Sequence, residues 1–289
     1  MIGVLLAIVA MFGWGAADFL AQRSARKVGN VTTLFSGSLF GFIVLFPSAY
    51  GDFGKLAGRP GLSLLIALGA VVGIFTALFS LEAYRRGKLS VVEPIMGMEL
   101  PFTILLAVAL RGERLDVPQI LAMTVIFLGI VLTAAANGAH PPSGKKLIER
   151  GALLGLVGVF GLGALNFLTG VISQEASPTL AVWSGRAVVA VFIGAYLVAK
   201  SRIASTFRAM RQHPVLVFSV SALYLVAFMA YATAVTLIPI SVATAISEGY
   251  IVLTVLLGVF INKEKLARHQ VAGVAVVASA VILLSYLNA

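Results

Sequence analysis

Apolar residues fill ten long stretches of this 289-residue chain, separated by short breaks that carry charge, glycine or proline. Each stretch is long enough for a helix that crosses the hydrocarbon core of a bilayer, which takes about 20 residues. A helix satisfies its own backbone hydrogen bonds in lipid, whereas an open strand does not. The pattern therefore predicts ten transmembrane helices, roughly at residues 2–22, 31–50, 62–84, 89–110, 118–136, 151–172, 177–199, 215–237, 240–261 and 268–287.

The two halves of the chain resemble each other. FGWGAADFL at 12–20 matches FGLGALNFL at 160–168, and LSVVEPIMGMELPFTILLAVALRGERLDVPQ at 89–119 aligns without a gap with 240–270. Because each half holds five helices, an odd number, the second half must enter the membrane from the opposite side. We expect an inverted repeat with a substrate cavity near the midplane, as in many secondary transporters. Its parts are residues 1–137, a linker at 138–150 and residues 151–289.

Composition supports a membrane protein and changes how the net charge is interpreted. Hydrophobic residues make up 60% of the chain and charged residues 11%, against about 25% charged in soluble domains. The net charge of +10 therefore indicates topology and not nucleic-acid binding. Of the 21 Lys and Arg residues, 16 fall in the loops on one side and four on the other. The positive-inside rule then predicts that both termini lie outside the cytoplasm. We also expect the first apolar stretch to be retained as a helix and not removed as a signal peptide.

The residues needed for soluble-enzyme chemistry are absent from the sequence. There is no cysteine, no phosphate-binding glycine loop and no HExxH motif, and the three histidines fall at loops or predicted helix ends. We therefore expect no cofactor, no metal site and no enzymatic activity.

Three charged residues fall near the middle of predicted helices: Glu99, Arg186 and Glu248. A charge at mid-bilayer costs roughly 2.5–3.5 kcal/mol on insertion scales, so such a residue is a functional hypothesis by default. In the alignment of the halves each stands opposite an uncharged residue, namely Tyr250, Ser38 and Gly97 for Glu99, Arg186 and Glu248 respectively. The substrate site is expected where the two copies differ in this way.

Two roles remain open for each of these charges. The planar guanidinium of Arg186 suits a substrate carboxylate or phosphate, but Arg186 can equally form a structural ion pair with Glu99 or Glu248. Burial in a helix bundle disfavours a charged carboxylate and a nearby arginine favours it. Glu99 and Glu248 are therefore proton-coupling candidates, and one of them can instead be a permanent counter-ion.

Other features are weaker. Pro94 and Pro101 remove backbone donors and predict a kink near Glu99 that frees the carbonyl of Gly97, although a kink serving packing alone is an alternative. Asp18 lies about one turn from Arg23, so local charge pairing explains it. The segments GERLDVPQ and NKEKLARHQ are interpreted as helix-ending turns with charge pairing, and 118–136 and 268–287 as scaffold.

The paired five-helix halves, FGWGAADFL, and the pattern from Ser90 to GERL and Gln119, repeated from Ser241 to Gln270, resemble the EamA family of the drug/metabolite transporter superfamily. The resemblance implies a basket of ten helices, in which the first four of each half surround a cavity and the fifth packs outside. It also implies transport of amino acids, other metabolites or drugs across the cytoplasmic membrane, often as export.

We therefore predict an all-α integral membrane protein that is a secondary transporter of small polar or amphipathic metabolites, with amino acids favoured. The expected partners are a small-molecule substrate and the lipid bilayer, with proton coupling left open and a monomer or homodimer as the assembly. The alternatives are efflux of organic cations or drugs, and a membrane component that does not transport. The predicted substrate-binding residues are Trp14, Glu99, Trp183, Arg186, Tyr231, Tyr250 and Glu248.

Overall fold

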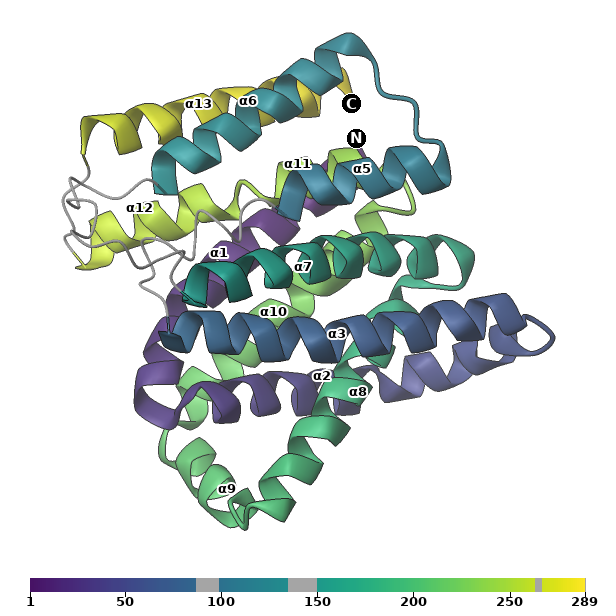
Figure 1. Cartoon of the computed structure of the whole chain (residues 1–289), viewed down its shortest axis with the longest axis vertical. Helices are drawn as coiled ribbons and strands as arrows, with labels where there is room; N and C mark the ends of the chain where they lie inside the picture. The colour runs from purple at the N-terminus through teal and green to yellow at the C-terminus, as the bar shows by residue number, and fades with distance from the viewer. Residues whose placement is uncertain (87–98, 135–149, 263–266, 289) are drawn as a thin grey trace.

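The computed structural model describes residues 1–86, 99–134, 150–262 and 267–288, which form helices without a strand (Figure 1). In chain order the elements are α1 (Ile2–Val28), α2 (Asn30–Asp52), the 3-10 helix η1 (Phe53–Leu56), α3 (Pro60–Arg86), α5 (Glu99–Arg111), α6 (Val117–Ala134), α7 (Arg150–Glu175), α8 (Pro178–Ala199), α9 (Ile203–Gln212), α10 (Pro214–Ala234), α11 (Ile240–Ser247), α12 (Tyr250–Asn262) and α13 (Arg268–Leu287).

Five helical stretches among the described residues are long and apolar enough to cross a membrane: α1, α2 with η1, α8, α10 and α13. Shorter apolar stretches occur at 60–76, 117–133 and 240–253. The protein is thus an all-helical, multi-pass membrane protein. The count of ten spanning helices stays a prediction, because 87–98, 135–149 and 263–266 lie outside the described residues.

Helices from the two halves of the chain pack together in pairs. The most extensive contacts join α1 to α10, α3 to α7, α6 to α13 and α2 to α8. In the predicted repeat α1 corresponds to α7 and α3 to α10, so exchanging the two halves converts the α1–α10 pair into the α7–α3 pair. The α6–α13 and α2–α8 pairs are each converted into themselves. The inverted repeat itself, with its boundaries at 137 and 151, stays a prediction.

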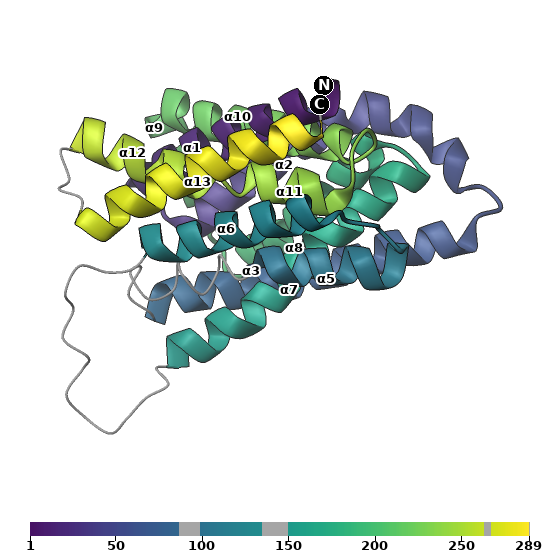
Figure 2. The same ribbon diagram turned by 90° about the horizontal axis from the view of Figure 1, so that it is seen from above.

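The α6–α13 pair lies at the upper edge of the molecule in Figure 1 and runs in front of other helices in the view from above (Figure 2). Glycine allows its close approach, since a Cβ added at Gly129 would lie 2.6 Å from Val277 and one at Gly273 would lie 2.7 Å from the backbone of Thr133. Packing of small residues at helix contacts is the usual way that helices associate in lipid.

One predicted helix, at 240–261, is broken in the structure. α11 ends at Ser247 and α12 begins at Tyr250. Between them Gly249, Ile251 and Val252 donate to carbonyls three residues back instead of four, which is 3-10 geometry. Gly249 fits this position because a Cβ there would lie 2.7 Å from the sulfur of Met11 on α1. The break places Glu248 at an irregular turn inside the molecule.

A second difference is α9, which lies in what the sequence pattern indicates to be a loop. Its Thr206 is buried, and Ile203 and Met210 pack on the buried cluster formed by Phe35, Ile193 and Leu197. The remaining side chains are mostly exposed. A short helix with one apolar and one polar face is stabilised by this one-sided packing, and it is too polar to stand out as an apolar stretch.

Candidate functional site

Aromatic side chains from three helices meet in the interior. Trp14 of α1 lies 5.2 Å from Phe228 and 5.4 Å from Tyr231 of α10, and 6.1 Å from Tyr250 of α12, measured between ring centroids. Trp14 and Tyr231 are buried. We call these four residues the aromatic cluster. Edge-on and tilted contacts of this kind suit the ring quadrupoles and fix the relative positions of the three helices.

Two carboxyl groups lie next to this cluster. The side chains of Glu99 on α5 and Glu248 at the α11–α12 break hydrogen-bond to each other. They are 7% and 1% exposed, and among the described residues one oxygen of each finds no hydrogen-bond partner. A carboxylate only accepts hydrogen bonds, so a bond between two carboxyl groups requires a proton on one of them. The contact between Glu99 and Glu248 therefore needs a proton on one of the two groups.

Arg186 of α8 contacts the aromatic cluster at Phe228. The central guanidinium carbon is 4.3 Å from the ring centroid of Phe228, a cation–π contact. Its buried Nη2 has no hydrogen-bond partner within the described parts of the chain. Gly41 of α2 makes room for the side chain, since a Cβ there would lie 3.0 Å from the Arg186 Cγ. Among the described residues no carboxylate forms an ion pair with Arg186, so the structural pairing with Glu99 or Glu248 is not what this conformation shows.

Asp18 has a longer-range partner than the sequence indicates. Its carboxylate accepts a hydrogen bond from the hydroxyl of Tyr224 and so joins α1 to α10. Arg23, the expected local partner, lies over the ring of Phe19 at 4.4 Å. Asp18 is close enough to act electrostatically on both Glu99 and Glu248. We therefore add Asp18 to the candidate site. The sequence does not reveal its partner, because Tyr224 is 206 positions away in the chain.

Tyr231 ties the cluster to the broken helix. Its hydroxyl lies 2.8 Å from the hydroxyl of Thr244, one turn before Glu248, and 3.4 Å from the carbonyl of Asn166 on α7. Each hydroxyl carries one proton. Either Tyr231 donates to Asn166 and accepts from Thr244, or Tyr231 donates to Thr244 while Thr244 donates to the carbonyl of Ile240. Tyr231 thus holds α7, α10 and α11 together at the depth of the carboxyl pair.

Trp183, one of the seven predicted site residues, packs its ring against aromatic residues outside the aromatic cluster. Its ring packs on Phe42, Phe46 and Phe53, at centroid distances of 5.6, 6.1 and 5.2 Å. Its indole N–H donates to the carbonyl of Phe42 at 3.1 Å. The other six lie in or beside the aromatic cluster. The predicted kink at Pro94 and Gly97 falls outside the described residues. Within those residues, no three His, Asp or Glu side chains are grouped as a metal ion requires.

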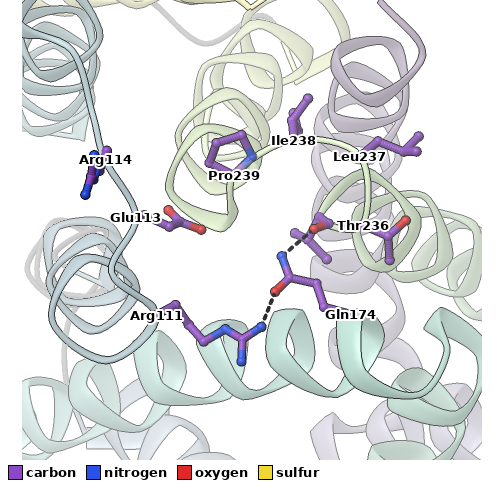
Figure 3. A pocket seen from close by; sticks show the side chains of 9 residues that line it. Arg111, Glu113, Arg114, Gln174, Thr236, Leu237, Ile238 and Pro239 are labelled. Carbon is purple, nitrogen blue, oxygen red and sulfur yellow. Dashed lines mark hydrogen bonds between the residues drawn. The ribbon is translucent and has the colours of Figure 1, made fainter.

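Polar contacts join the two halves at the surface that carries both chain ends. Arg59 and Arg111 both bind the carboxylate of Glu175, at 2.9 and 3.0 Å. Arg111 also donates to Gln174, which donates to the carbonyl of Val235 (Figure 3). We call this surface the terminal face. An open pocket of about 380 Å³ remains there, lined by Arg111, Glu113, Arg114, Gln174 and 235–239.

Glu113 caps a helix of the other half at this face. Its two carboxylate oxygens accept the backbone N–H groups of Ile240 and Ser241 at 2.6 and 3.1 Å, and it also accepts the Ser241 hydroxyl. These are the first residues of α11, where N–H groups lack partners within the helix. The segment GERLDVPQ is thus a helix-ending turn, as expected, but its glutamate binds the opposite half of the chain. The aligned Glu264 and Ser90 lie outside the described residues.

Comparison with known proteins places this architecture in a family. The model of the EamA-like transporter family matches residues 1–135 and 149–286. The chain belongs to the EamA-like transporter family. The family resemblance inferred from the sequence is therefore confirmed, and the chain is a membrane transporter. The family name points to transport and not to catalysis.

Relatives agree with this assignment. An uncharacterized transporter of Archaeoglobus fulgidus is 20% identical over 286 residues, with 98% of each chain covered. A protein of Methanocaldococcus jannaschii is 29% identical over 70 residues, which is 24% of this chain and 51% of that protein. A solved crystal structure superposes with a TM-score of 0.75 at 13% identity, covering 99% of this chain and 97% of the other. At that identity the likeness concerns the fold alone.

Proposed function

We propose that this EamA-family protein is a secondary transporter that exports small zwitterionic metabolites, of which amino acids are the favoured class, in exchange for protons. The observation that carries the proposal is the separation of charges in the site. Arg186 lies over the ring of Phe228, and among the described residues one of its nitrogens finds no hydrogen-bond partner. The Glu99–Glu248 pair is close enough to Tyr231 to act on it electrostatically.

This arrangement matches the chemistry of an amino acid. The guanidinium of Arg186 presents a planar fork that suits a carboxylate. The free oxygens of Glu99 and Glu248 accept hydrogen bonds from an ammonium group, and Trp14 and Tyr250 pack against the aliphatic or aromatic body. An exchange mechanism follows, since the proton and the ammonium group use the same carboxyl pair and each displaces the other.

Alternating access would expose this site to the two sides of the membrane in turn. In the conformation described here the contacts of Glu113, Glu175 and Arg111 hold the terminal face closed. By the distribution of Lys and Arg residues this face lies outside the cytoplasm. Substrate would then enter the carrier from the cytoplasm and leave when these contacts separate, which is the direction of export across the cytoplasmic membrane.

Uptake into proteoliposomes tests the substrate class. Labelled amino acids are offered to the wild-type protein and to Arg186→Ala, Arg186→Lys and the control Arg268→Gln, which removes an exposed arginine of α13. We expect Arg186→Ala to abolish transport, Arg186→Lys to retain part of it, and the control to match wild type. Unchanged transport by Arg186→Ala refutes the carboxylate clamp.

Proton coupling has its own test. An inward proton gradient should accelerate amino-acid export by the wild-type protein, and Glu99→Gln or Glu248→Gln should remove this dependence. Export that responds equally to the gradient in both variants would show that the pair carries no coupling proton.

Efflux of organic cations is a second candidate, supported by the three carboxyl groups of Asp18, Glu99 and Glu248 around the aromatic cluster. In that case Glu99→Gln and Glu248→Gln abolish cation binding, while Arg186→Ala spares or improves it. The opposite outcome, in which Arg186→Ala abolishes binding, identifies the anionic group of the substrate as essential and excludes a simple cation.

A further inference from the structure

The segment 200–213, KSRIASTFRAMRQH, contains α9 and joins α8 to α10 on the face opposite to the terminal face. It carries four Lys or Arg residues and no acidic residue. Arg208 and Arg211 share one side of α9, three residues apart, and both are exposed. Among the described residues no carboxylate pairs with either arginine. The apolar side of α9 is already covered by its packing on Phe35 and Leu197.

The acidic residues of the described chain are elsewhere. Of the acidic residues whose side chains the structure describes, Asp52, Glu113, Asp116 and Glu175 belong to the terminal face, and Asp18, Glu99 and Glu248 lie among the helices. Glu82 of α3 is outside this comparison, because its side chain is not among those described. The charged residues of segment 200–213 are all positive, and Arg26 and Lys27 at the end of α1 add two more exposed cations. Each cation close to an anionic membrane surface contributes about 1 kcal/mol of attraction.

An apolar cleft begins where α9 ends. It has a volume of about 360 Å³ and is lined by Leu20 of α1, by His213, and by Pro214, Val215, Leu216 and Ser219 at the start of α10. His213 is the residue between α9 and α10, two positions after Arg211. The exposed arginines and the cleft are therefore neighbours in the chain, and α9 contacts both α1 and α10.

We propose that this cleft and the exposed side of α9 form a binding site for an anionic phospholipid of the leaflet at this face. The headgroup phosphate is bound by Arg208 and Arg211, and an acyl chain occupies the cleft between α1 and α10. A guanidinium matches the geometry of a phosphate group, and a short amphipathic helix with arginines on its polar side is typical of elements that lie at a membrane surface.

The site is connected to the centre of the protein through its walls. α1 carries Trp14 and Asp18, and α10 carries Tyr224, Phe228 and Tyr231. The lipid therefore contacts the outer part of the two helices whose inner parts form the aromatic cluster. Binding of the lipid does not require the proposed substrate, and the test below measures binding and not transport.

Thermal unfolding of the purified protein in detergent measures the interaction. Phosphatidylglycerol and phosphatidylcholine with identical acyl chains are added at matched amounts, and inorganic phosphate is added separately. We expect phosphatidylglycerol to raise the Tm by several degrees more than phosphatidylcholine and inorganic phosphate to have no effect. An equal shift with both lipids would overturn headgroup recognition, and an equal shift with inorganic phosphate would overturn the role of the acyl chain.

Two variants locate the site. Arg208→Gln/Arg211→Gln should remove the difference between the two lipids, whereas the control Arg114→Gln/Arg268→Gln, which also removes two exposed arginines, should keep it. Ser219→Phe fills the cleft and should lower the number of phosphatidylglycerol molecules retained in native mass spectrometry. Retention of the full lipid preference by the α9 variant, or equal loss in the control, refutes the site.

Discussion

Replacing Glu113 with alanine should open the terminal face. The Glu113 carboxylate accepts two N–H groups and a hydroxyl at the first turn of α11. Loss of an N-cap acceptor costs about 0.5–2 kcal/mol, and loss of a negative charge at a helix N-terminus costs about 0.3–1 kcal/mol. If the contact exists only in the closed conformation, Glu113→Ala shifts the balance toward the open one by about 1–3 kcal/mol. That is a factor of about 5 to 150, at 1.4 kcal/mol per tenfold change.

The absence of cysteine from the chain makes an accessibility assay direct. A single cysteine is introduced at Val235, which is 0% exposed near the terminal face, or at Val220, which is 1% exposed toward the other end of α10. Labelling with a hydrophilic maleimide should be about 5 to 150 times faster at position 235 in the Glu113→Ala background. Ser241→Ala, which removes only the hydroxyl donor, should have a smaller effect.

The second cysteine separates opening from unfolding. A gate at the terminal face leaves labelling at position 220 unchanged or slower, because opening one side closes the other. Faster labelling at both positions would mean that Glu113→Ala loosens the whole bundle. Unchanged labelling at position 235 would refute the reasoning altogether, since it would show that the Glu113 contacts do not hold this face closed.

Three further predictions follow from the packing and the polar contacts. The free energy of unfolding is measured by titration with SDS. Gly13→Ala should lower it by about 1–3 kcal/mol, because the added Cβ would lie 2.8 Å from Ala227. The control Gly37→Ala, whose Cβ would lie 4.0 Å from the nearest described atom outside its own helix, should be neutral or stabilising in the same titration. Glu175→Gln should cost less than about 1 kcal/mol per ion pair in that titration, because Arg59 and Glu175 are 46% and 34% exposed. A loss of several kcal/mol would show that the network is stronger than its exposure implies. Trp183→Phe leaves Trp14 as the sole tryptophan, and its fluorescence should still respond to substrate with wild-type affinity; a weakened response would return Trp183 to the site.

The membrane class and most helix positions could be predicted because they depend on local composition. Ten apolar stretches are visible in the sequence, and the described helices begin and end within a few residues of them except at three places. α1 continues to Val28, beyond the apolar stretch, because a helix need not end where the chain leaves the hydrocarbon. α9 was missed because its stability comes from packing against Phe35 and not from an apolar run. The break after Glu248 was missed because a single glycine in an apolar stretch is a weak signal.

The site was predictable to the extent that buried charge is rare in membrane helices. Glu99, Arg186 and Glu248 stand out in the sequence for that reason, and six of the seven predicted residues lie in or beside the aromatic cluster. Their partners were not predictable. The pairing of Asp18 with Tyr224, and of Glu99 with Glu248, joins residues far apart in the chain that only the packing of the helices brings together. Trp183 was included because it precedes Arg186 by one turn, but its ring turns toward α2.

The two members of the carboxyl pair come from different halves of the chain. This has a consequence for transport cycles that would run without substrate or proton. Without a proton or an ammonium group between them, Glu99 and Glu248 would be two negative charges in hydrogen-bonding range and away from water, and they would repel. Under the proposed exchange mechanism, the two halves would approach at this depth only when a proton or a substrate ammonium group is bound by the pair. An empty, unprotonated carrier would then resist the occluded conformation, and the pair would discourage transport cycles in which neither substrate nor proton is moved.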